Sequence, residues 1–145
     1  YKTREAVNSL LLSELSGKWN RAGYLCFSDD SYYCPSVEEF DTFLANGNRV
    51  GSSGNPVLYS EGFDCDDFAF ALKGNVSLYN LNVAKKKHGW AVGIIWGDFS
   101  WVEGFHAANW FISSDKGLLL YESQADIRGY YGMDHCTGNV NLILL

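Results

Sequence analysis

The chain has 145 residues, of which 47% are hydrophobic, 16% aromatic and 19% charged, and these proportions exclude a disordered or fibrous protein. The formal net charge of −6 argues against a nucleic acid or an anionic membrane as the main partner. No apolar run approaches the roughly 18 residues that span a bilayer, so we expect a soluble protein. One domain over residues 1–145 is expected, because this length suffices for a single core. The chain opens on Tyr1 rather than Met, so we expect either a processed product or a module of a larger protein.

Three helices are predicted in the first half of the chain. Apolar residues at helical spacing over residues 1–16 predict the first helix. A capping box over residues 36–39 begins the second, which ends near Asn46. A glycine-rich and serine-rich loop over residues 51–56 then leads to a third helix over residues 65–78.

The hydrophobic period changes from helical to alternating after His88. Strands are predicted over residues 89–96, 106–112, 118–123 and 140–145. Helices followed by hairpin-connected strands predict an α+β fold, in which N-terminal helices pack on an antiparallel β-sheet.

Cys65 is the most informative residue, because it stands between two aspartates at the start of the third predicted helix. A thiol at a helix N-terminus feels the positive end of the helix dipole, which favours the thiolate. The unpaired backbone N–H groups there can also receive an oxyanion. The position therefore predicts a nucleophile.

His106 and Glu122 follow Cys65 in the order that cysteine catalysis needs. If the five-residue loop before Leu118 closes a regular hairpin, Ile112 pairs with Leu118, and Glu122 lies diagonally opposite His106 on the same face of the sheet. An imidazole can hold and return a proton, and a carboxylate can fix its tautomer. The predicted catalytic residues are therefore Cys65, His106 and Glu122.

Four short segments carry a family resemblance: residues 64–69, 89–93, 106–109 and 121–124. Together they resemble the papain-like, calcium-dependent cysteine peptidase domain of the Marasmius oreades agglutinin type and its bacterial relatives. The resemblance covers most of the chain from about residue 30. It implies a papain-like or transglutaminase-like fold and a calcium-activated cysteine endopeptidase, a hydrolase that cleaves a protein or peptide substrate through an acyl-enzyme. The sugar-binding β-trefoil of that family is missing, so glycan recognition does not carry over.

Calcium also has a physical rationale in the aspartates beside the thiol. The carboxylates of Asp64, Asp66 and Asp67 oppose formation of the Cys65 thiolate, and a bound divalent cation would reverse this effect. Carboxylate and amide oxygens suit Ca²⁺, and the resemblance adds Gln124 to the three aspartates as a ligand.

Three alternatives remain open. An NlpC/P60-like cell-wall amidase and a transglutaminase-like acyl transferase or deamidase would each use the same helix cysteine and strand histidine. His88 is a rival to His106, because residues 88–94 loosely resemble the histidine strand of NlpC/P60 peptidases. The third alternative is a non-catalytic, calcium-dependent binding module. Separately, Cys26 and Cys34 flank a short loop and can pair in an oxidising compartment, and the sequence leaves their state open.

Overall fold

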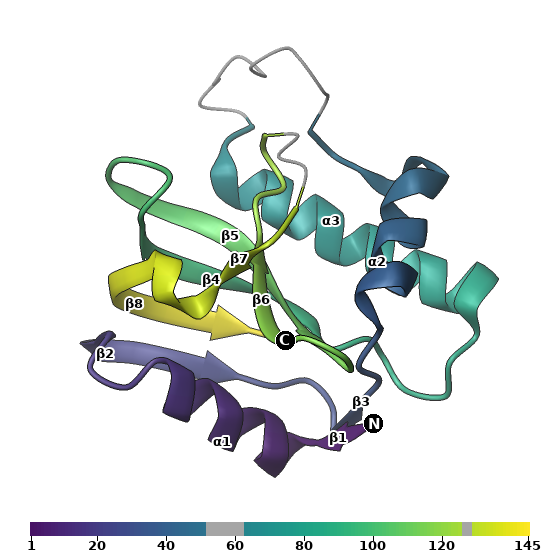
Figure 1. The fold of residues 1–145 in the computed structure, drawn as a ribbon, viewed down its shortest axis with the longest axis horizontal. Coiled ribbons are helices and arrows are strands. Elements are labelled where there is room, and N and C mark those ends of the chain that lie inside the picture. Colours follow the sequence, from purple (N-terminus) through teal and green to yellow (C-terminus); the bar gives the residue numbers. More distant parts are fainter. Residues whose placement is uncertain (52–62, 126–128) are drawn as a thin grey trace.

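The structure is a computed structural model that describes residues 1–51, 63–125 and 129–145, so most of the predicted loop over residues 51–56 lies outside the described residues. A six-stranded sheet forms its centre, and helices cover both faces (Figure 1). In chain order the elements are β1 (Lys2–Thr3), α1 (Arg4–Glu14), β2 (Trp19–Cys26), β3 (Ser31–Tyr32), α2 (Val37–Phe43), η1 (Leu44–Asn48), α3 (Cys65–Tyr79), η2 (Asn80–Ala84), β4 (Val92–Phe99), β5 (Phe105–Ser113), β6 (Gly117–Tyr121), β7 (Tyr131–Gly132), η3 (Met133–His135) and β8 (Cys136–Leu144). Among the described residues, no helix is long and apolar enough to cross a membrane.

The local signals for the three helices are confirmed. At the start of α2, the Ser36 side chain accepts from the Glu39 N–H, and the Glu39 side chain accepts from the Ser36 N–H, which is the predicted capping box. The third helix begins at Cys65 as predicted and ends at Tyr79. Each signal lies within a few residues of the helix end that it determines.

The sheet differs from the prediction, because β2 was missed. The strand order is β2-β8-β4-β5-β6-β7, and β2 runs parallel to β8 while the other neighbouring pairs are antiparallel. The sheet is therefore mixed, and the predicted α+β arrangement of N-terminal helices followed by an antiparallel sheet is wrong. Residues 19–26 include Gly23 and lack a clear alternation of apolar and polar residues, so the local pattern gave no sign of a strand whose partner lies near the other end of the chain.

The hairpin of β5 and β6 has the predicted register. Ile112 pairs with Leu118, and Asn109 pairs with Tyr121. Because of this register, the chain that follows Tyr121 lies beside the start of β5, where Glu122 contacts His106.

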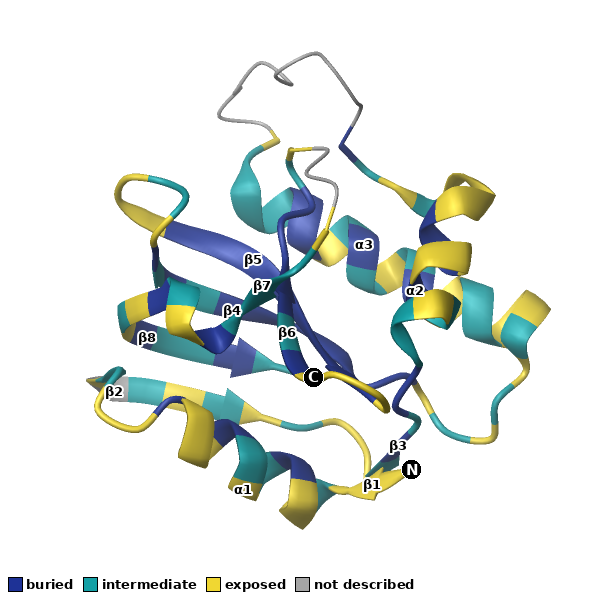
Figure 2. Ribbon diagram, viewed as in Figure 1, coloured by how far each residue is buried: buried dark blue, intermediate teal, exposed yellow. Residues whose placement is uncertain are grey.

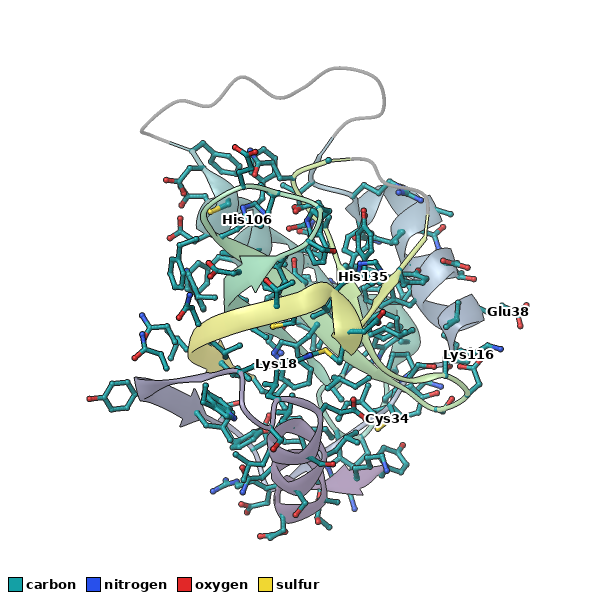
Figure 3. The ribbon with its side chains drawn as sticks, turned by 60° about the vertical axis from the view of Figure 1, so that its left-hand side comes forward. Lys18, Cys34, Glu38, His106, Lys116 and His135 are labelled. Atoms are coloured by element: carbon teal, nitrogen blue, oxygen red, sulfur yellow. The ribbon has the colours of Figure 1, made fainter. Side chains whose placement is uncertain are left out.

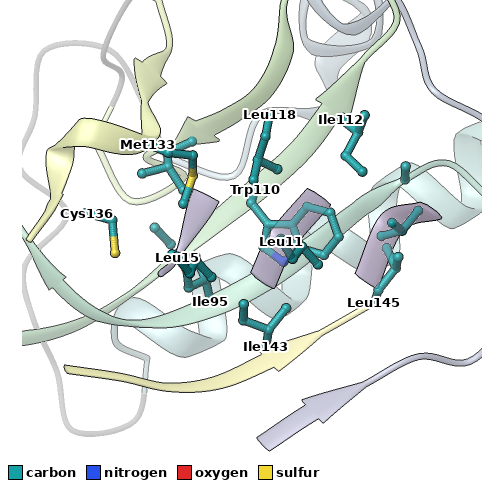
Figure 4. Close-up of a cluster of buried hydrophobic side chains, with 14 of the residues drawn as sticks. Leu11, Leu15, Ile95, Trp110, Ile112, Leu118, Met133, Cys136, Ile143 and Leu145 are labelled. Atoms are coloured by element: carbon teal, nitrogen blue, oxygen red, sulfur yellow. The ribbon is translucent and has the colours of Figure 1, made fainter. Parts of the chain in front are cut away.

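Two hydrophobic cores lie on opposite faces of the sheet. Leu11 and Leu15 of α1 pack on one face with Ile95 and Trp110, as Figure 4 shows, and Phe40 of α2 packs on the other face. Side chains of β4 and β5 alternate between the two cores, and both strands are buried along most of their length (Figure 2). Burial on both faces explains the apolar character of these strands, and it fixes the position of α3 above β5.

Candidate functional site

The first turn of α3 lies on the N-terminal half of β5. The Asp64 N–H donates to Asp67 Oδ2 at 3.1 Å, which closes the start of the helix. Further along, the buried Asn109 amide donates to Ala69 O at 3.0 Å and to Gly93 O at 3.2 Å, so one side chain ties the helix to the sheet. These contacts fix Cys65, whose Sγ accepts a hydrogen bond from the Ala107 N–H at 3.4 Å.

Glu122 is buried and accepts three hydrogen bonds. Its Oε2 accepts from His106 Nε2 at 2.6 Å and from Trp101 Nε1 at 2.8 Å, and its Oε1 accepts from the Gln124 N–H at 2.9 Å. His106 and Glu122 are each only 4% exposed. The structure therefore brings His106 and Glu122 together, with the Gln124 backbone beside them.

The charge of Glu122 follows from these contacts. Burial alone raises the pKa of Glu122, but the hydrogen bonds and the charge of His106, with the Gln124 and Trp101 donors, lower it below its ordinary value. Glu122 is thus ionised at neutral pH and accepts from a protonated Nε2 of His106. Within the described residues, Nδ1 of His106 has no hydrogen-bond partner, so this nitrogen is available to a ligand.

Cys65 is not hydrogen-bonded to His106 in the described part of the chain. Strand alternation explains this. His106 has the same parity as Ala108, which lies in the core under α1, whereas Cys65 packs against Ala107 in the small cluster below α3. Figure 3 shows His106 near the end of the molecule where α3 begins. The two predicted residues therefore lie on neighbouring elements, and among the described residues no hydrogen bond joins them directly.

The pKa of the Cys65 thiol is raised above its ordinary value. Burial is the main cause, the Ala107 N–H opposes it, and the negative charges of Asp64 and Asp66 add to the rise. The benefit expected from the helix N-terminus is therefore outweighed.

The predicted aspartates are only partly gathered into one group. Ligand atoms of Asp64, Cys65 and Asp66 lie within 4.8 Å of one another. The Asp64 Oδ1 atom is buried and has no hydrogen-bond partner among the described residues, and the neighbouring Asp64 side chain raises the pKa of Asp66. A hard cation such as Ca²⁺ fits this pair of carboxylates. Asp67 differs, because one of its oxygens already holds the Asp64 N–H.

Cys26, Cys34 and His88 were also singled out in the sequence. Cys26 and Cys34 are both free thiols, and no disulfide joins them. The alternative histidine, His88, packs against the Tyr1 ring at 5.0 Å between ring centroids and borders a hollow with Asp29. Its contacts are thus with the N-terminal segment.

Trp101 is the functional residue that sequence reasoning missed. It donates to Glu122, and its indole ring stacks on Tyr131 at 4.2 Å and on Phe99 at 4.7 Å between ring centroids. No local pattern reveals a hydrogen bond to a residue 21 positions away.

Comparison with known proteins gives a family and a fold. The family model described as "Agglutinin C-terminal" matches residues 48–126. A solved structure titled "PSL1a-E64 complex" is 24% identical, with a TM-score of 0.75, over 99% of this chain and 50% of that chain. A structure of the Polyporus squamosus lectin, bound to the human-type influenza-binding epitope Neu5Acα2-6Galβ1-4GlcNAc, is also 24% identical, with a TM-score of 0.71, over 99% of this chain and 49% of that chain. A comparison with curated proteins found no match.

These findings correct the predicted family, fold class and activity. The family model is described as an agglutinin C-terminal domain and a structure of similar fold is a lectin, and these findings contradict the predicted papain-like cysteine peptidase, its papain-like or transglutaminase-like fold class and its hydrolase activity with a catalytic triad. The predicted activity rested on the order of Cys65, His106 and Glu122 along the chain, and order alone does not establish a proton relay. The chain spans about half the length of the similar solved chains. Since the family model covers more than half of this chain, the chain belongs to the Agglutinin C-terminal family.

Proposed function

We propose that this chain is a non-catalytic, calcium-dependent binding module of an agglutinin-type protein, and that its ligand is a carbohydrate. The observation that carries the proposal is the family match over residues 48–126, which includes Cys65, His106 and Glu122. The carbohydrate class comes from the lectin of similar fold, whose title names a sialylated glycan.

The chemistry of the site supports binding without turnover. Burial raises the pKa of the Cys65 thiol, and its sulfur accepts a hydrogen bond from a backbone N–H. Glu122 accepts hydrogen bonds from His106, Trp101 and the Gln124 N–H, and these three bonds hold the donor groups in place. Such a rigid polar group presents fixed donors and acceptors to a ligand.

The proposed site residues have two roles, as polar contacts of the ligand and as calcium ligands. His106 and Glu122 form one buried polar pair, in which His106 Nδ1 is the proposed contact for a ligand hydroxyl, and Cys65 lies on the other face of β5 as a separate proposed contact. Asp64, Asp66, Asp67 and Gln124 are the proposed calcium ligands, and the unpartnered Oδ1 of Asp64 is the atom that supports this most directly. Calcium would neutralise the aspartate pair and organise the first turn of α3.

Titration calorimetry with Neu5Acα2-6Galβ1-4GlcNAc tests the proposal. We expect saturable binding in millimolar Ca²⁺ and a loss of at least tenfold in affinity after chelation with EGTA. Asp66→Asn should reproduce the effect of EGTA, whereas Asp134→Asn, an exposed aspartate outside the site, should not. Equal affinity with and without calcium would remove the metal from the proposal.

A second experiment tests the absence of turnover. Peptide libraries and E64, an epoxide that alkylates thiols, are incubated with the chain in millimolar Ca²⁺ and followed by mass spectrometry. We expect no peptide fragments and no faster modification of Cys65 than of the exposed Cys26. Peptide cleavage that disappears in Cys65→Ala would overturn the non-catalytic proposal.

A further inference from the structure

Three aromatic rings form a stack beside the buried pair of His106 and Glu122. The indole of Trp101 lies nearly parallel to the Tyr131 ring, with 4.2 Å between the ring centroids and 8° between the planes. It is also nearly parallel to the Phe99 ring, at 4.7 Å and 22°. Its Nε1–H donates to Glu122 Oε2 at 2.8 Å. The indole is therefore held by two rings and one hydrogen bond.

The indole depends on these contacts because it comes from a turn. Trp101 follows β4 and lies outside the strands, in the segment that joins β4 to β5. An indole has a single donor, so its polar group contributes one hydrogen bond at most. Ordering a side chain costs conformational entropy, which aromatic stacking offsets. The position of the indole is thus set by the rings beside it rather than by a strand.

The segment from β7 to η3 holds this turn. The Ser100 N–H donates to His135 O at 2.9 Å, and Ser100 Oγ lies 2.7 Å from His135 Nδ1. The His135 ring packs against Tyr131, with 5.0 Å between the ring centroids. Tyr131 also pairs with Leu120 of β6. The sheet and His135 together fix the Tyr131 ring, which presents a fixed face to the indole.

The orientation of the Glu122 carboxylate depends on its donors. The last torsion of a glutamate side chain has broad preferences, so contacts set the plane of the carboxylate. Oε2 accepts from Trp101 Nε1 and His106 Nε2, and Oε1 accepts from the Gln124 N–H. Without the indole, Oε2 would keep one donor and the carboxylate plane could turn. The hydrogen bond from Nε2 in turn sets the direction of the His106 ring and of its Nδ1.

Tyr131 lies near this carboxylate without bonding to it. Burial raises the pKa of the Tyr131 hydroxyl, and the negative charge of Glu122 adds to the rise. Within the described parts of the chain, this hydroxyl makes no hydrogen bond. The contribution of Tyr131 to the site is therefore made by its ring.

We infer that Tyr131 is a positioning residue of the site: its ring holds the Trp101 indole on Glu122 and thereby fixes the orientation of His106. The inference rests on the proposed function for one step only, the use of His106 Nδ1 as a ligand contact. The positioning itself can be measured without a ligand.

The side-chain N–H signals in ¹H–¹⁵N spectra measure the positioning. We expect the Trp101 indole N–H, assigned as the signal lost in Trp101→Phe, to exchange slowly with solvent, because it is bonded to a buried carboxylate. Tyr131→Leu should speed this exchange about three- to tenfold, as expected for the loss of one aromatic pair, and should shift the Nε2–H signal of His106. Tyr131→Phe keeps the ring and should match the unmodified chain. Tyr131→Val, with a β-branched residue suited to a strand, is a second aliphatic variant, so the result does not depend on the folding of one.

Tyr130→Phe is the matched control at the neighbouring residue. The Tyr130 hydroxyl donates to Asp41 of α2, and its ring packs against Phe40 and Phe111 in the other core. The variant removes an anchor of the same segment without changing the stack, so exchange of the Trp101 N–H should stay slow. If exchange rose as much as in Tyr131→Leu, loosening of the segment would be the cause and the inference would be wrong.

Titration calorimetry with Neu5Acα2-6Galβ1-4GlcNAc in millimolar Ca²⁺ connects the stack to binding. We expect Tyr131→Leu to weaken binding about three- to tenfold and Tyr131→Phe to bind as the unmodified chain does. Unchanged Trp101 and His106 signals in both aliphatic variants would overturn the inference, whether or not the glycan binds. A released indole with unchanged affinity would also overturn it, since the stack would then not serve the ligand contact. If the unmodified chain binds no glycan, the proposed function fails, and the two N–H signals alone decide whether Tyr131 positions His106.

Discussion

Glu122→Gln tests whether the buried carboxylate holds its surroundings together. Glu122 accepts three hydrogen bonds on two oxygens, two of them on Oε2. Glutamine keeps one oxygen. At best it retains the His106 and Trp101 bonds, and then its NH₂ group faces the N–H of Gln124, so that one donor is left unsatisfied.

The magnitude follows from this count. Hydrogen bonds to a charged acceptor contribute roughly 1.5–3 kcal/mol each, and an unsatisfied buried donor costs roughly 1–3 kcal/mol. One lost bond and two weakened ones give an expected loss of about 2–4 kcal/mol in the free energy of unfolding at pH 7. The measurement is urea denaturation followed by tryptophan fluorescence, with Glu103→Gln, an exposed glutamate, as the matched control.

The pH dependence gives a second signature. The folded pKa of Glu122 lies below its ordinary value of 4.5, so its ionised form contributes stability above about that pH, and this contribution is lost as the pH falls through the folded pKa. The difference between Glu122→Gln and the unmodified chain should therefore shrink in acid. A loss below about 0.5 kcal/mol at pH 7, or a difference that grows in acid, would refute the reasoning.

Three further predictions concern other contacts. Asp66→Asn should speed alkylation of Cys65 by iodoacetamide at pH 7 several-fold in EGTA, because it removes one of the charges that raise the pKa of the thiol. Lys73→Met should stabilise the fold at pH 7 by about 1–3 kcal/mol in urea denaturation, because burial lowers the pKa of Lys73 to about 8 against the opposing charge of Asp29; the gain should vanish as the pH rises through 8 towards 10.5. Gly93→Ala should lower the melting temperature by several degrees or prevent folding, because a Cβ there would lie 2.2 Å from the Leu144 carbonyl oxygen.

Each of these predictions has a control within the chain. Asp134→Asn, outside the aspartate group, should leave the Cys65 rate unchanged. Lys87→Met, at an exposed lysine, should change stability by less than about 0.5 kcal/mol. Gly138→Ala should be tolerated, since nothing lies within 4 Å of a Cβ at that position. If a control changed as much as its partner variant, the stated cause would be wrong.

The correct predictions rest on contacts between residues that are close to each other in the sequence. The capping box at Ser36, the start of α3 at Cys65 and the pairing of Ile112 with Leu118 each involve residues less than seven positions apart. The approach of His106 to Glu122 followed from that register, because one hairpin positions both side chains.

The features that the sequence did not predict rest on contacts between residues that are far apart in the sequence. The parallel pairing of β2 with β8 joins Tyr24 to Leu142, and no turn or period encodes it. The indole of Trp101 reaches Glu122 because Tyr131 stacks against it, which needs β7 in place. The family assignment failed at a different level, since the order of functional residue types along a chain does not state whether their side chains share a face.

β8 pairs with two strands, β2 and β4, that are synthesised before it. β8 lies between β2 and β4, so these two strands, which are synthesised earlier, remain without their shared neighbour until β8 emerges from the ribosome. The core beneath α1 includes Val140 and Ile143 of that strand and cannot close before then. Closing a loop of more than one hundred residues slows folding, and it exposes an unpaired strand edge during synthesis. Synthesis of this chain should therefore place greater demands on chaperones than its length suggests.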